Sequence, residues 1–71
     1  MPEMIFVDSS NVEMIGYDPD LQELHVKYLS SSTVYVYLGC PQYAWDELEM
    51  AESKGTYINR MIKPAYPCEK R

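Results

Sequence analysis

The sequence LHVKYLSSSTVYVYL, residues 24–38, decides the fold of this chain. Its first part alternates, with Leu24, Val26 and Tyr28 on one side of a strand. A turn of three serines, 30–32, separates it from a second alternating run, so the stretch predicts a β-hairpin. A three-residue hairpin loop usually needs glycine in the left-handed region, and the serines offer none. Either a serine adopts that conformation or the loop is longer.

The register of the hairpin is predicted by matching its faces. Pairing Val26 with Val36 gathers the aliphatic side chains on one side, and a slip by one residue would mix the faces. On the other side, Lys27 then pairs with Tyr35, and Tyr37 follows along the same face. We therefore expect Val26 and Val36 in the core, with Tyr35 and Tyr37 at least partly exposed.

Segments on both sides of the hairpin complete an α+β domain. Hydrophobic spacing and turn residues predict the remaining elements. In chain order they are an additional short edge strand at 5–7, a strand at 11–17, a helix that starts at Pro41 and ends at 53–55, and a second helix at 56–62. The expected architecture is a three-stranded antiparallel meander, with the extra N-terminal edge strand, followed by two helices packed on one face. Residues 1–71 form a single domain, with 1–4 and 67–71 flexible.

Composition is typical of a small globular domain. Hydrophobic residues make up 46% of the chain and charged residues 24%, which excludes a disordered chain. No stretch approaches the roughly 18 apolar residues of a membrane helix, and the N-terminus lacks the features of a signal peptide, so we expect a cytoplasmic protein. In that compartment Cys40 and Cys68 remain free thiols, and they lack the paired spacing of a zinc site.

Charge is distributed unevenly along the chain. Residues 1–52 contain ten acids and one base, Lys27, whereas residues 53–71 contain five bases and one acid, Glu69. The two parts therefore carry formal charges of -9 and +4, which sum to -5. Because an acidic surface repels nucleic acid, any such ligand would have to bind the basic C-terminal segment.

The order of motifs along the chain resembles the KTSC domain. The matching pieces are VDSSNV at 7–12, IGYD at 15–18, YVY at 35–37, the helix that starts at Pro41, SKGTYIN at 53–59, Ile62, and Tyr66-Pro67. The chain departs from the family pattern at Ser32, where glycine is common, and at Cys40, where valine is usual. The resemblance implies a small bacterial domain of unknown function. Because the domain also occurs at the C-terminus of some lysyl-tRNA synthetases, the resemblance suggests RNA binding by analogy.

Two groups of residues are candidates for an RNA site. The first is Tyr35 and Tyr37, which stand about 7 Å apart on one strand face beside Lys27. Aromatic rings on an open sheet with a cation nearby can stack unpaired bases. The alternative is that these rings only pair across the strands and cover the sheet.

The second group lies in and beside the last predicted helix, 56–62. Lys54, Arg60 and Lys63 come near one another there, with the amide of Asn59 beside them, and they can bind phosphates. The alternative is a solvated helix end with cations placed where the helix dipole favours them.

Catalysis is not expected. His25 is the only histidine, and the sequence brings neither cysteine near it. No metal cluster, phosphate loop or nucleotide-binding motif is present, so no cofactor or metal is expected. The leading hypothesis is a non-enzymatic module that binds single-stranded or tRNA-related RNA. The alternative is a protein-interaction or dimerisation module without nucleic-acid affinity, and the sequence leaves the oligomeric state open.

Overall fold

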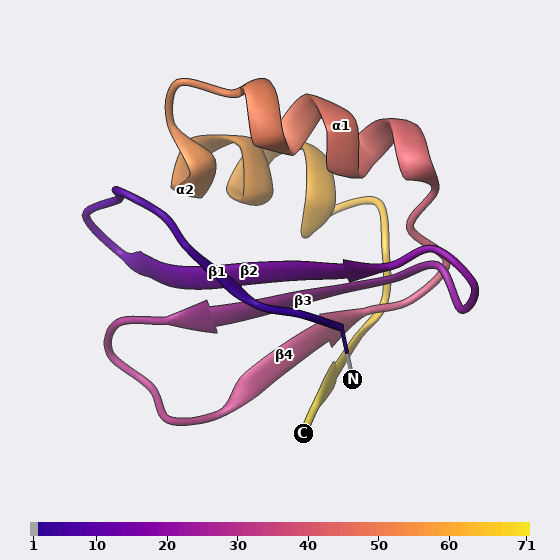
Figure 1. Cartoon of the computed structure of the whole chain (residues 1–71), viewed down its shortest axis with the longest axis horizontal. Helices are drawn as coiled ribbons and strands as arrows, with labels where there is room; N and C mark the ends of the chain where they lie inside the picture. Colours follow the sequence, from indigo (N-terminus) through magenta and orange to yellow (C-terminus); the bar gives the residue numbers. More distant parts are fainter. Residues whose placement is uncertain (1) are drawn as a thin grey trace.

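The computed structural model describes residues 2–71 and contains one antiparallel sheet of five strands. The strands follow one another in the sheet in the order in which they occur in the chain (Figure 1). They are β1 (Ile5–Phe6), β2 (Val12–Asp18), β3 (Glu23–Tyr28), β4 (Val34–Tyr37) and β5 (Cys68–Lys70). The predicted meander and the predicted N-terminal edge strand are both present.

The helices lie together over one face of this sheet (Figure 1). They are α1 (Gln42–Met50), α2 (Lys54–Tyr57) and the π-helix η1 (Ile58–Ile62), which continues directly from α2. The α+β architecture with helices on one face is therefore as predicted. Within residues 2–71, no helix is long and apolar enough to cross a membrane.

The fifth strand corrects the prediction of a flexible tail at 67–71. Cys68 pairs with Tyr37 and Lys70 with Tyr35, so β5 extends the sheet beyond β4. Its side chains are exposed, and its order comes from backbone hydrogen bonds such as Leu38 N to Pro67 O at 2.8 Å. A strand held in this way leaves no hydrophobic pattern in the sequence.

The register of the central hairpin differs from the prediction by one residue. Val26 pairs with Tyr35 rather than Val36, and Lys27 pairs with Val34. The loop between β3 and β4 is longer than three residues, which is the second of the two loop alternatives. As a result Tyr37 faces the helices and is 3% exposed, so its predicted exposure is wrong.

The core lies between the helices and the upper face of the sheet. The side chains buried there come from β2, β3, β4, α1 and η1, and from Cys40, two residues before α1. They are Val12, Ile15, Leu24, Val26, Tyr37, Cys40, Ala44, Leu48, Ile58 and Ile62. Val36 is also fully buried, but it pairs with His25 and points to the other face of the sheet.

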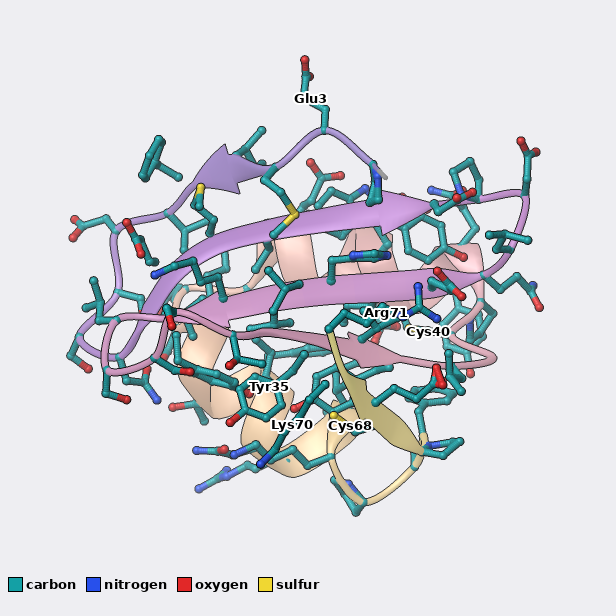
Figure 2. All side chains as sticks on the ribbon, turned by 90° about the horizontal axis from the view of Figure 1, so that it is seen from below. Glu3, Tyr35, Cys40, Cys68, Lys70 and Arg71 are labelled. Carbon is teal, nitrogen blue, oxygen red and sulfur yellow. The ribbon has the colours of Figure 1, made fainter. Side chains whose placement is uncertain are left out.

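That second face is covered by the two ends of the chain. A β-carbon on Gly16 would collide with the side chain of Met4 and the carbonyl of Glu3, so glycine is needed where the N-terminal segment crosses β2. From the other end, Arg71 lies across the sheet (Figure 2) and binds both carboxylate oxygens of Glu23, at 3.1 and 3.2 Å. His25 is consequently 3% exposed.

The segment at 53–55 begins the second helix instead of ending the first. The helix α1 ends at Met50, and Ala51 is already extended. Ser53 is the N-cap of α2, because its side chain accepts a hydrogen bond from the backbone NH of Thr56. Gly55 therefore lies inside α2 and is not the C-cap of α1.

Candidate nucleic-acid interface

An open cleft of about 330 Å³ lies between the turn after β3 and the end of η1. It is lined by Asn11, Tyr28, Ser30, Ser31, Tyr35, Tyr37 and Lys63. Of the described residues that line it, none carries a carboxylate, although the chain has eleven acids and six bases. The lining groups are hydroxyls, one amide and one ammonium, all of which can donate hydrogen bonds. Such a lining favours a ligand rich in acceptor oxygens or carrying negative charge.

Three tyrosines form the aromatic wall of the cleft. The rings of Tyr28 and Tyr35 meet edge to face, with centroids 5.4 Å apart and planes inclined by 72°. The hydroxyls of Tyr28 and Tyr37 are hydrogen-bonded at 3.0 Å. Burial, followed by the hydrogen bond to Tyr28, raises the pKa of Tyr37 well above its usual range. Tyr37 therefore presents a neutral hydroxyl to the cleft, while the half-buried Tyr28 and Tyr35 supply ring surface.

Two lysines lie over these rings. The Nζ atom of Lys63 is 5.3 Å from the centroid of Tyr28, and that of Lys70 is 5.8 Å from the centroid of Tyr35. Figure 2 shows Lys70 and Tyr35 together at one edge of the sheet. Both distances are within the range of cation–π attraction. β5 thus adds a second cation beside the aromatic wall.

Asn11 enters the cleft from the loop before β2. Ser9 Oγ accepts weak hydrogen bonds from the backbone NH groups of Asn11 and Val12, at 3.4 and 3.3 Å, which fixes this loop as a turn. The carboxamide oxygen of Asn11 lies so close to Gly55 that a β-carbon there would collide with it. Gly55 is therefore needed to seat the Asn11 side chain, which explains a glycine inside α2.

The structure brings together three of the seven predicted site residues, Tyr35, Tyr37 and Lys63. Asn59 and Arg60 are exposed on η1, close to Lys63 in the chain but outside the cleft lining.

The other two predicted site residues have structural partners. Lys27 points to the opposite face of the sheet, where it forms an ion pair with Glu13. Lys54 donates to the carbonyl oxygens of Glu49 and Ala51, at 2.8 and 2.7 Å, and so binds the end of α1. Neither ammonium group faces the cleft.

Sequence reasoning missed the remaining residues that line the cleft, and Lys70 beside it. Tyr28 was assigned to the core face, and Ser30 and Ser31 to a plain turn. Lys70 was placed in a flexible tail. Asn11 belongs to the sequence SSN at 9–11, which by itself is far more typical of a turn than of a ligand site.

A second cleft, also of about 330 Å³, lies on the opposite face of the sheet. Its lining is mainly apolar and includes Leu21 and the buried His25. Two of its charged groups bind each other, because Arg71 donates to both carboxylate oxygens of Glu23, and these hydrogen bonds hold the pKa of Glu23 below its usual range. No group of three or more His, Cys, Asp or Glu side chains gathers as a metal site within residues 2–71.

Comparison with known proteins gives consistent results. The family model of the KTSC domain matches residues 8–66. A protein of Tsukamurella paurometabola without a functional name is 38% identical over 60 residues, which cover 84% of this chain and 88% of that protein. An uncharacterised protein of Stutzerimonas stutzeri is 34% identical over 62 residues, covering 87% and 86% of the two chains. The crystal structure of a KTSC domain protein from Yersinia pestis has a TM-score of 0.93 and 34% identity, covering 100% of this chain and 99% of that one.

Proposed function

This chain belongs to the KTSC domain family, and from its donor-lined tyrosine cleft we propose that it is a non-enzymatic module that binds single-stranded RNA. The supporting observation is the absence of carboxylates from the described lining of a cleft in an acidic protein. An RNA strand offers phosphate and ribose oxygens to the donors and unpaired bases to the rings. We further propose that the module acts in the cytoplasm on tRNA-related or other single-stranded RNA.

Binding requires that a base replace a lysine on a tyrosine ring. A contact such as that of Lys63 with Tyr28 or of Lys70 with Tyr35 is worth about 0.5–1 kcal/mol at an exposed site, whereas stacking of a base on an aromatic side chain is worth about 1–3 kcal/mol. The exchange is therefore favourable. The released ammonium group then meets the phosphate that the incoming nucleotide carries.

The number of available cations limits the affinity. Lys27, Lys54 and Arg71 have partners in the protein. Near the cleft this leaves Arg60, Lys63 and Lys70, which take part in no ion pair within residues 2–71. Three phosphate contacts at about 0.7 each give a log-log salt slope of roughly 2 for a single strand. Binding should be weak, and duplex DNA should be a poor ligand because the rest of the chain is acidic.

The test is a titration of fluorescent single-stranded RNA at several salt concentrations. The wild-type protein should show the slope of roughly 2, and replacing Arg60, Lys63 and Lys70 together by alanine should bring it close to zero. Tyr35→Ala should lose about 1–3 kcal/mol of binding at unchanged slope. Lys27→Ala, which removes one cation from the opposite face, is the matched control and should bind as wild type. No RNA binding in low salt, or an unchanged slope in the triple variant, would refute the proposal.

A second candidate function is protein interaction through the sheet edge. The edge strand β1 carries Ile5 and Phe6, which are 41% and 75% exposed, and an exposed strand edge with apolar side chains can pair with another chain. Sedimentation analysis distinguishes this function from the first. A dimer that Phe6→Glu dissociates, in a protein without RNA affinity, would favour the second candidate.

A further inference from the structure

We infer that the tyrosine cleft holds a single nucleotide unit, and that the side-chain amide of Asn11, seated by Gly55, donates a hydrogen bond to it. The inference rests on the proposed function and assigns the ligand class and a specificity-determining residue to the same cleft. The nucleotide unit is either a free nucleoside monophosphate or one residue of an RNA chain, since both present the same phosphate, ribose and base.

The size of the cleft limits the size of the ligand. A volume of about 330 Å³ lies at the lower end of the roughly 300–1,000 Å³ found for small-molecule sites. The edge-to-face packing of Tyr28 and Tyr35 limits the number of stacked bases, because two rings inclined by 72° do not form a continuous platform for successive bases. The cleft therefore offers stacking for one base.

The charge of the cleft also matches a single nucleotide. Lys63 is the only cation among the described lining residues, and it can neutralise one phosphate. The other donors are neutral: the Tyr28 and Tyr37 hydroxyls share one hydrogen bond, so one of their protons remains available. Ser31 Oγ accepts from Thr33 N at 3.0 Å, which leaves its own proton to donate. Neutral donors of this kind suit ribose, base and phosphate oxygens.

The contacts of the Asn11 side chain define the direction in which its amide group points. Its carboxamide oxygen packs against Gly55 and accepts from Ser9 Oγ at 3.2 Å. The amide nitrogen has no hydrogen-bond partner within residues 2–71, and the residue lines the cleft. Asn11 therefore serves as a donor to the ligand. Gly55 acts as a positioning residue, because any side chain there displaces the amide.

The first experiment compares uridine monophosphate with oligouridylates of two, four and eight nucleotides, followed by NMR of the protein amides. With one base-binding site whose flanking phosphates meet Arg60 and Lys70, affinity expressed per nucleotide stays within about threefold from tetramer to octamer, and the side-chain NH₂ signals of Asn11 shift. Binding of the monophosphate identifies a free nucleotide as ligand, and binding of the dimer alone identifies an RNA residue. An octamer more than about threefold tighter per nucleotide than the tetramer would overturn the inference and leave the proposed function intact. The absence of binding by every probe would overturn both.

The second experiment tests the Asn11–Gly55 pair. Loss of one hydrogen bond predicts binding about 3- to 10-fold weaker for Asn11→Ala. Asn11→Asp keeps the shape but replaces the donor by a negative charge, so it should bind more weakly still. Gly55→Ala should weaken binding as Asn11→Ala does, and the double alanine variant, which removes the collision, should be no weaker than either. Asn59→Ala, an exposed asparagine outside the cleft, is the control. Unchanged affinity in both Asn11 variants would exclude the assigned role.

Discussion

The hydroxyl of Tyr17 donates a 2.6 Å hydrogen bond to the carbonyl oxygen of Cys40, 23 residues further along the chain. The same ring stacks on Trp45, with centroids 5.8 Å apart and planes inclined by 11°. Tyr17 thereby joins the end of β2 to the start of α1. Because the backbone carbonyl is held by a residue of the sheet, the helix and the sheet are coupled at this point.

Replacing Tyr17 by phenylalanine removes only this hydrogen bond and keeps the stacked ring. The free energy of unfolding should fall by about 0.5–1.5 kcal/mol, measured by urea denaturation. Tyr35→Phe, at a tyrosine whose hydroxyl has no partner within residues 2–71, is the control and should leave the stability nearly unchanged. Equal losses in the two variants would argue against the coupling.

Leu48 is fully buried in α1 against the sheet, and Met50, two residues later, is 85% exposed. Leu48→Ala should lower the free energy of unfolding by about 2–5 kcal/mol, since the lost side chain leaves a cavity. For so small a domain this is much of the total stability. Met50→Ala on the same helix should change the thermal midpoint little, and an unchanged midpoint for Leu48→Ala would place that side chain outside the core.

Lys54 provides a test that separates stability from binding. Its ammonium binds two carbonyl oxygens at the end of α1, so Lys54→Ala should cost about 1 kcal/mol of stability. The salt slope of RNA binding should stay as in wild type, because this ammonium does not face the cleft. A flatter slope in Lys54→Ala, measured at a temperature where the variant is folded, would contradict this assignment.

Alkaline pH should destabilise the fold through Cys40. Burial raises the pKa of its thiol from 9.0 to about 11, so the folded state keeps its proton where the unfolded state has lost it. The contribution to stability is complete below about pH 9 and is lost as the pH rises towards about 11. The steepest part is about 1.4 kcal/mol per pH unit, the value for one proton.

Cys40→Val removes this titration. We expect the loss of stability between pH 8 and pH 10.5 to be smaller in the variant than in the wild type, as measured by urea denaturation at each pH. Any constant packing cost of valine cancels in this comparison. Tyr37 and Tyr57, whose pKa values are also raised, titrate in both proteins. Identical losses would show that the Cys40 thiol does not ionise on unfolding.

The sequence predicts those parts of the fold whose periodicity is set by the core. The alternation in β3 and the helix that starts at Pro41 were correctly identified, and Ala44 and Leu48 of that helix are buried against the sheet. The register of β4 was wrong because both its faces are apolar enough to be buried. Tyrosine can serve as a core residue when its hydroxyl finds a partner, as Tyr37 does with Tyr28.

The site was only partly predictable for a related reason. Tyr35 and Lys63 stand out by residue type, but their neighbours are determined by contacts between distant segments. Lys70 reaches Tyr35 through the pairing of β5 with β4, and Asn11 reaches the cleft through its contact with Gly55. No spacing in the sequence encodes either contact.

The π-helical turn has an evolutionary consequence. In η1 the backbone NH of Lys63 donates to the carbonyl of Ile58, five residues earlier, at 2.9 Å, so this turn holds one residue more than an α-helical turn. Deleting one residue between Ile58 and Ile62 would convert this turn to an α-helical turn and leave Lys63 near its present position, because four α-helical steps of about 100° also bring a residue back over the Ile58 carbonyl. Homologues with one residue fewer in this turn are therefore expected to keep both the fold and the cation of the cleft, so the length of this turn can vary in evolution without loss of the site.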